Sequence, residues 1–235
     1  MIPIKDTIPS RSYPIVNVLI IITNCLVFFF ELSLGSKLNK LFLIFGMVPV
    51  KFYYLISTAP FNIFGIFLPF LTSLFLHAGW IHIIGNMLYL WIFGDNVEDR
   101  MGHFRYLVFY LICGVVANIT HLYTEPVSGI PTIGASGAIA GVMGAYFVLY
   151  PRAKVVTLVP IFFFFYLIEI PAFFFLGFWF LLQFLSGSIS LAASGHDIGG
   201  IAWWAHIGGF LSGIVLVFIF RKKKRHHRIY RDQYT

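Results

Sequence analysis

Charged side chains are scarce in this chain: Asp, Glu, Lys and Arg together make up 11% of its 235 residues. A soluble domain usually carries about a quarter, so this low share excludes an ordinary water-soluble fold. Hydrophobic residues make up 59% of the chain, phenylalanine alone occupies 28 positions, and the mean hydropathy is +0.88. The composition therefore predicts an integral membrane protein.

Cysteine is almost absent. Cys25 and Cys113 both fall within apolar segments, so a disulfide framework is not expected. A removable leader is not expected either, because the first apolar run, at about residues 15–30, lacks a small-residue cleavage site and is long enough to stay in the bilayer. With no internal repeat or low-complexity linker, residues 1–235 are treated as one domain with a core at about 15–220.

Positive charge is concentrated at the C-terminus. The net charge is +7, and seven of the sixteen Lys and Arg residues lie between Arg221 and Arg231, directly after the last apolar run. A basic cluster in this position is the expected cytoplasmic stop of a transmembrane helix, and it argues against nucleic acid as a partner. Contact with anionic membrane lipid stays open as a second use of the same charges. We expect residues 221–235 to form a basic cytoplasmic tail.

Six segments are apolar enough to cross a membrane, where a span needs about 20 residues. They lie near residues 15–31, 76–94, 105–123, 135–150, 170–189 and 202–220. Hydropathy alone also allows a seventh crossing at 155–168. Seven crossings would place the basic tail outside, against the positive-inside rule. We therefore expect residues 155–168 to be interfacial or packed against the bundle. This stretch carries Pro160 and is followed by Pro171. Six crossings place both termini in the cytoplasm.

The connection at about residues 32–75 is long and apolar but contains no clear span. Its lysines, Lys37, Lys40 and Lys51, lie among leucines and phenylalanines, a composition typical of a segment in the membrane interface. The sequence therefore predicts an all-α membrane protein, a bundle of six transmembrane helices whose first loop is partly embedded in the membrane.

Four polar residues lie close to one end of three of these spans. His82 and Asn86 fall in the second span, Ser136 in the fourth and His206 in the sixth. At a rise of 1.5 Å per residue their depths agree within roughly 10 Å, and two residues four apart share one helix face. Each alone has a structural explanation, such as helix packing or an interfacial position. Their common depth predicts a functional site towards the outer face, because polar groups in hydrocarbon are costly. The cluster stays in the outer half, which argues against a channel or transporter.

The chemistry of these residues fits serine hydrolysis. A serine hydroxyl is a weak nucleophile until a neighbouring base takes its proton, and His206 is the candidate base for Ser136. His82, Asn86 and the backbone N–H groups around Ser136 are candidate donors to an oxyanion. No acidic residue lies near this depth in the fourth or sixth span, and neither of the nearest candidates, Glu169 and Asp197, is placed to complete a triad, so we expect a Ser–His dyad.

Small residues recur at four-residue spacing in the fourth and sixth spans. They include Gly137 and Gly141 in the fourth span and Gly209 and Gly213 in the sixth. Such spacing lets helix backbones approach closely in lipid. We therefore expect these two spans to pack tightly, which would bring Ser136 towards His206.

Three motifs, in this order along the chain, resemble those of the rhomboid intramembrane serine proteases. His82-Ile83-Ile84-Gly85-Asn86 resembles their His-x-x-x-Asn, Gly134-Ala135-Ser136-Gly137 their Gly-x-Ser-Gly, and Ala205-His206-Ile207-Gly208-Gly209 their last-helix histidine. The resemblance covers about residues 15–220 and implies a rhomboid fold.

The same resemblance implies roles for the four residues and a class of substrate. Ser136 would be the nucleophile, His206 the general base, and His82 and Asn86 would help to bind the oxyanion. The reaction would hydrolyse peptide bonds in or near transmembrane segments of single-pass or other membrane proteins, without a metal or cofactor. The alternative is a non-catalytic rhomboid-like protein that binds membrane clients, although such proteins typically lack the serine or the histidine.

Other positions bear on the resemblance. Some members carry an aromatic residue, stacked on the base histidine, where this chain has Ala140, so the orientation of His206 is left open. Glu98 and Arg100 either tie helix ends together or form a solvated charged loop. The lack of a leader and the compact plan lead us to expect the cytoplasmic (inner) membrane of a prokaryote. Substrate identity and oligomeric state are not predicted.

Overall fold

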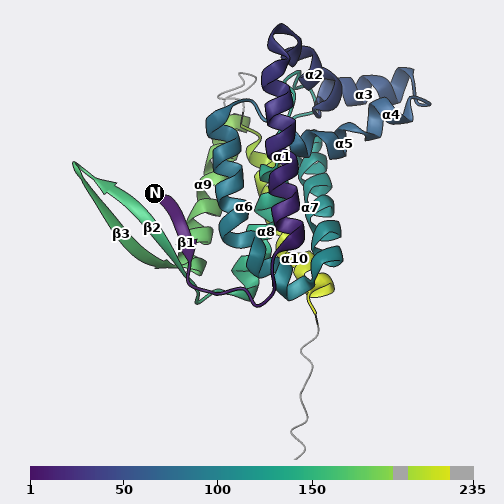
Figure 1. Cartoon of the computed structure of the whole chain (residues 1–235). Helices are drawn as coiled ribbons and strands as arrows, with labels where there is room; N and C mark the ends of the chain where they lie inside the picture. The colour runs from purple at the N-terminus through teal and green to yellow at the C-terminus, as the bar shows by residue number, and fades with distance from the viewer. Residues whose placement is uncertain (193–200, 223–235) are drawn as a thin grey trace, which may run out of the picture.

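The computed structural model describes residues 1–192 and 201–222, and six long helices within them lie side by side in a bundle (Figure 1). Their bounds follow the six apolar segments closely and confirm the predicted helical membrane bundle. They are α1 (Ile15–Ser33), α6 (Trp80–Met101), α7 (His103–Thr124), α8 (Ser136–Leu149), α9 (Ala172–Ala192) and α10 (Trp203–Phe220).

The six helices differ in how well each could span a bilayer alone. Within the described residues, four helices are each long and apolar enough to cross a membrane: α1, α7, α9 and α10. The helix α6 meets the same criterion only when it is counted together with the segment Ile63–Phe75, and the two are bent by 79° relative to each other. The helix α8 has 14 residues, fewer than the roughly 20 of an ordinary span. Four or five crossings are therefore supported, and the count of six stays a prediction.

The short helix α8 occupies the centre of the bundle. Its residues from Gly137 to Tyr146 are all buried, and its neighbours include α6, α7 and α10. A Cβ atom at Gly209 or Gly213 of α10 would collide with the carbonyl oxygens of Gly137 and Gly141 of α8. The predicted close packing of these two helices is thus confirmed, because only the missing side chains allow the backbones to approach so closely.

Short helices fill the first long connection and project from one end of the bundle (Figure 1). Phe61 and Phe64 in this region are 95% and 80% exposed, which fits the expected position in a membrane interface. The segments are 3₁₀ turns at Gly35–Lys37 and Ser73–Phe75 and helices α2 (Leu38–Phe45), α3 (Pro49–Thr58), α4 (Ile63–Phe67) and α5 (Pro69–Thr72).

A small antiparallel sheet is the main feature that the sequence did not predict. The strands β1 (Ile2–Asp6), β2 (Lys154–Ile161) and β3 (Phe164–Pro171) pair in the order β1-β2-β3. The stretch expected to be interfacial or packed against the bundle is thus a hairpin that extends away from the bundle (Figure 1). Its β-branched and aromatic residues favour strands, and a helical seventh crossing is excluded.

The segment before α1 and the residues after α10 meet at the end of the bundle that holds the turn from α6 into α7. The Ser12 hydroxyl donates to Asp99 at 2.7 Å, and the Lys222 backbone N–H donates to the carbonyl oxygen of Arg100 at 2.8 Å. Glu98 accepts hydrogen bonds from the first backbone N–H groups of α1, at Val16 (3.0 Å) and Asn17 (2.7 Å). Glu98 therefore ties two helix ends together, as one of the two interpretations predicted.

Candidate functional site

Ser136 and His206 lie in direct contact at the other end of the bundle. Ser136 is the first residue of α8, and His206 is the fourth residue of α10. The ring atom Nε2 of His206 lies 2.8 Å from the hydroxyl oxygen of Ser136. The close packing of α8 against α10 brings the two residues together, since Gly137 and Gly209 meet just beyond them. A hydroxyl hydrogen-bonded to an imidazole is the arrangement in which the ring can take the proton of a serine nucleophile.

The start of α8 is shaped by a glycine. Gly134 has a φ of +121°, a backbone conformation that favours glycine because other residues have a Cβ. A Cβ at this position would also meet the ring of His82, whose Nε2 would lie 2.6 Å away. The glycine two residues before Ser136 therefore lets the His82 ring lie against the chain that leads into α8.

His82 and Asn86 present donors to the same place. The side-chain nitrogen of Asn86 would be 3.5 Å from a Cβ at Gly134, so both side chains converge beside the start of α8. The Ala78 N–H donates to Nδ1 of His82 at 3.4 Å. An acceptor nitrogen carries no proton, so this bond leaves the proton of the neutral ring on Nε2. The first backbone N–H groups of α8 add further donors, since a helix start leaves them without intrahelical partners.

Asn86 is held by residues to which the sequence assigned no role. Its amide nitrogen lies 3.0 Å from Nε2 of His77, whose side chain is 1% exposed. The backbone N–H of His77 in turn donates to both carboxylate oxygens of Glu31 at 3.2 Å. A buried acidic residue in the first apolar segment was the available signal, because such a group needs partners.

The orientation of His206 is set by α9, which sequence reasoning missed. The side-chain oxygen of Gln183 lies 2.7 Å from Nδ1 of His206. The Trp179 ring lies 5.9 Å from the imidazole, at an angle of 35° between the planes. At the position where some rhomboids carry an aromatic residue, Ala140 instead faces Gly209. An aromatic neighbour is thus present, but it comes from another helix.

Gln183 also fixes which nitrogen of His206 carries the proton. An amide oxygen can only accept, so Nδ1 of His206 donates to it and Nε2 is left as an acceptor. Nε2 is the atom that faces Ser136. The one amide in an otherwise apolar run of α9, from residue 172 to 185, was the signal in the sequence.

Of the two nearest acidic candidates, Glu169 lies away from the candidate site. Glu169 lies on β3 at the base of the hairpin and accepts a hydrogen bond from Lys154 at 2.7 Å. This hydrogen bond and the charge of the Lys154 ammonium lower the pKa of Glu169. Asp197 lies outside the described residues. The partner that the structure gives to His206 Nδ1 is a neutral amide.

A cavity of about 1000 Å³ joins these groups. Its wall includes His82, Asn86, Ser136 and His206, together with Trp179 of α9 and Ile133 of the segment before α8. A space of this size is in the range of ligand-binding clefts, which combine apolar walls with a few convergent polar groups. The arrangement can therefore hold an extended chain segment with a carbonyl group beside the serine hydroxyl.

The chain is similar in sequence to known proteins over most of its length. The sequence profile of the Rhomboid domain matches residues 65–223. Rhomboid protein 1, mitochondrial, of Saccharomyces cerevisiae is 28% identical over 166 residues, which cover 67% of this chain and 44% of that protein. Rhomboid-like protein 11, chloroplastic, of Arabidopsis thaliana is 28% identical over 158 residues, with 65% and 52% covered.

A third relative, from Bacillus subtilis, is 37% identical over 76 residues, which cover 32% of this chain and 38% of that protein. The chain therefore spans about half or less of the length of the curated relatives that it matches. The profile match alone extends over more than half of the chain and contains all three motifs. This chain belongs to the rhomboid family.

Proposed function

We propose that this protein is an intramembrane serine protease that hydrolyses peptide bonds in or near transmembrane segments of other membrane proteins. The observation that carries the proposal is the 2.8 Å contact between His206 Nε2 and the Ser136 hydroxyl, in the wall of a cavity that also holds His82 and Asn86. A nucleophile, a base and donors for an oxyanion are the groups that acyl transfer requires.

The reaction follows from these atoms. The Ser136 oxygen attacks the carbonyl carbon of the scissile bond while Nε2 of His206 takes the hydroxyl proton. The carbonyl oxygen becomes an oxyanion that accepts hydrogen bonds from His82 Nε2, the Asn86 amide and the Ser136 backbone N–H. His206 then gives its proton to the leaving amine, and an acyl-enzyme remains on Ser136. Water, activated by the same ring, hydrolyses the ester and restores the serine.

Gln183 acts in this scheme as a positioning residue. Its amide oxygen accepts the hydrogen bond from Nδ1 of His206, which keeps the basic nitrogen towards Ser136 in every turnover. Asp performs this task in the serine protease triad, where it also stabilises the charged imidazolium. A neutral amide orients the ring without supplying a counter-charge.

The substrate would enter sideways, past α9 or the first loop, and unwind locally at the cleaved bond, because a helix hides its backbone carbonyls. The helix α9 suits a movable wall: it carries Gly177, and Phe174 and Phe178 on it are 64% and 48% exposed. Since Gln183 lies on the same helix, an outward movement of α9 would break its bond with His206. Substrate entry and the orientation of the base would then be coupled.

The membrane orientation is also part of the proposal. With the basic end of the bundle in the cytoplasm, both termini lie there and the candidate site faces outward. The expectation of a prokaryotic cytoplasmic membrane finds little support, since two of the relatives described above are named as mitochondrial and chloroplastic. The finding that stands is an integral membrane protein.

The decisive experiment compares cleavage of a model single-pass substrate by wild type, Ser136→Ala and His206→Ala in liposomes. We expect both variants to lose cleavage while their thermal unfolding stays unchanged. Ser188→Ala is the matched control, because among the described residues the Ser188 hydroxyl bonds the carbonyl of Phe184 in its own helix. Labelling of Ser136 by a fluorophosphonate tests the nucleophile without any substrate. Absence of both labelling and cleavage in the wild type would leave the non-catalytic binder as the better description.

A further inference from the structure

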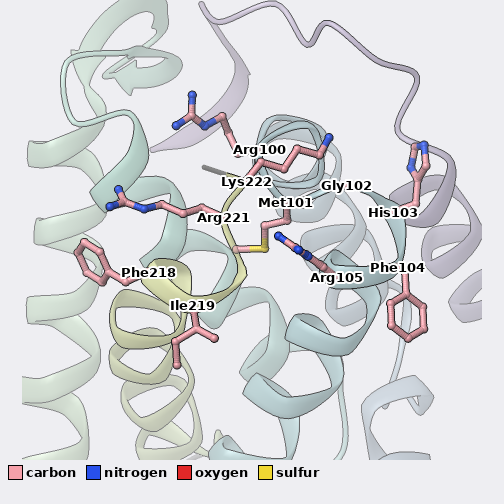
Figure 2. A pocket seen from close by; sticks show the side chains of 10 residues that line it. All are labelled: Arg100, Met101, Gly102, His103, Phe104, Arg105, Phe218, Ile219, Arg221 and Lys222. Carbon is pink, nitrogen blue, oxygen red and sulfur yellow. The ribbon is translucent and has the colours of Figure 1, made fainter. Parts of the chain in front are cut away.

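A second cavity lies at the end of the bundle opposite Ser136. It has a volume of about 1080 Å³ and is formed where the turn from α6 into α7 meets the last turn of α10 (Figure 2). None of its residues contributes to the candidate active site, so its use has to be inferred from its own chemistry.

The wall of this cavity carries an excess of positive charge. Arg100 lies in the last turn of α6, Arg105 in the first turn of α7, and Arg221 and Lys222 follow α10. The two ion pairs found among the described residues are those of Glu98 with His103 and of Glu169 with Lys154. The four cations of the cavity thus have no carboxylate partner in that part of the chain, and an anion would find little competition for them.

Contacts between the helix ends hold this wall in place. The Lys222 backbone N–H bonds the carbonyl of Arg100, and its ammonium donates to the carbonyl of Asp99 at 3.3 Å. Lys222 also passes close over Gly102, where a Cβ would meet its side chain at 2.9 Å. The positively charged residues therefore lie on two backbone segments that are hydrogen-bonded to each other, the end of α6 and the residues after α10.

Exposed apolar side chains adjoin the charges. Phe104 is 77% exposed, Phe218 56% and Ile219 70%, and Figure 2 shows them beside the arginines on the outer turns of α7 and α10. On a membrane protein, apolar surface next to cations at a helix end lies where acyl chains meet head groups. Figure 2 also shows the guanidinium groups of Arg100, Arg105 and Arg221 spread around the cavity, which suits an extended head group better than a small free ion.

We propose that this cavity binds one anionic phospholipid, with its phosphate among Arg100, Arg105, Arg221 and Lys222 and its acyl chains along Phe104, Phe218 and Ile219. The inference does not rest on protease activity, because the site lies at the opposite end of the bundle. Bound there, the lipid would join the ends of α6, α7 and α10 and fix the depth of the bundle in the cytoplasmic leaflet.

The test measures lipid binding by the full chain in detergent micelles, by native mass spectrometry, with phosphatidylglycerol and phosphatidylcholine as probes. The variant Arg105→Gln/Arg221→Gln removes two cavity charges. The variant Arg11→Gln/Arg152→Gln is matched to it, since it removes two exposed arginines from the same end of the bundle but outside the cavity. Glycerol 1-phosphate, which has the head-group chemistry without acyl chains, is added as a competitor.

We expect the wild type to retain phosphatidylglycerol in preference to phosphatidylcholine at one site. Loss of two contacting cations should weaken this binding about 30-fold, whereas the matched variant should stay within about 3-fold and glycerol 1-phosphate should not compete. Equal losses in the two variants would reduce the site to general surface charge and overturn the proposal. Displacement by glycerol 1-phosphate would show a site for free phosphate esters instead, and a wild type without lipid preference would also refute it.

Discussion

Replacing Gln183 by leucine isolates the part of the site that the sequence did not reveal. The substitution removes the amide oxygen that lies 2.7 Å from His206 Nδ1, at a side chain that is 8% exposed. A buried donor left without a partner costs about 1–3 kcal/mol. If this cost falls on the productive orientation of the ring, kcat decreases about 5- to 150-fold. KM should stay nearly constant, because Gln183 contacts the ring nitrogen that faces away from Ser136.

The assay is steady-state cleavage of a single-pass substrate in liposomes, with the rate of fluorophosphonate labelling as a second readout of serine activation. Gln183→Glu keeps an acceptor oxygen at the same distance, so we expect it to retain most of the activity. Leucine is at least as favourable as glutamine in a membrane helix, so any decrease in stability should not exceed the cost of the unpaired ring N–H. Ser188→Ala again serves as the control on the same helix.

Two results would refute the positioning role. One is a Gln183→Leu enzyme with wild-type kcat and labelling rate. The other is an equal loss in Gln183→Glu and Gln183→Leu, because a role in helix packing alone would not distinguish an acceptor oxygen from a methyl group. An increase in KM with unchanged kcat would place Gln183 in substrate binding instead.

Three further predictions follow from the described contacts. Gly209→Val pushes a side chain into the carbonyl of Gly137, so overpacking should cost about 1–3 kcal/mol of stability and lower both the thermal midpoint and the labelling rate of Ser136. Asn86→Ala removes an oxyanion donor, so kcat should decrease about 10²- to 10³-fold, and loss of its contact with the buried His77 should lower stability by about 1–3 kcal/mol. Burial raises the pKa of Asp6 from 3.8 to about 6, so ionisation of this carboxyl opposes folding. Stability should therefore decrease as the pH rises from about 4 to about 6. Asp6→Asn should remove this part of the pH dependence, as measured by thermal unfolding.

Each of these has a clear contrary result. A Gly209→Val protein as stable as the wild type would mean that α8 and α10 are not in backbone contact. Full activity in Asn86→Ala would leave the oxyanion to His82 and the helix start. Parallel stability curves for wild type and Asp6→Asn between pH 4 and pH 6 would show that Asp6 is equally solvated in the folded and unfolded states.

The sequence predicted the helices well where hydrophobicity alone decides them. An apolar run of about 20 residues must satisfy its backbone within itself in lipid, so the helix bounds could be taken from the run. The hairpin at 154–171 was missed because a short apolar run has no period that separates strand from helix. Its pairing with β1 joins residues about 150 positions apart, and no local pattern records such a partner.

By itself, the sequence determined the membrane class, the helical bundle, the family and the four residues expected at the site. Composition, the length of the apolar runs and motif spacing are properties of the chain before it folds. They predict the membrane class, the helices and the family, respectively. Only the tertiary structure decided which side chains support those four. Gln183 and Trp179 reach His206 from α9, and His77 and Glu31 support Asn86. Such contacts depend on the rotation and depth of each helix, and these are fixed by packing against its neighbours rather than by local sequence.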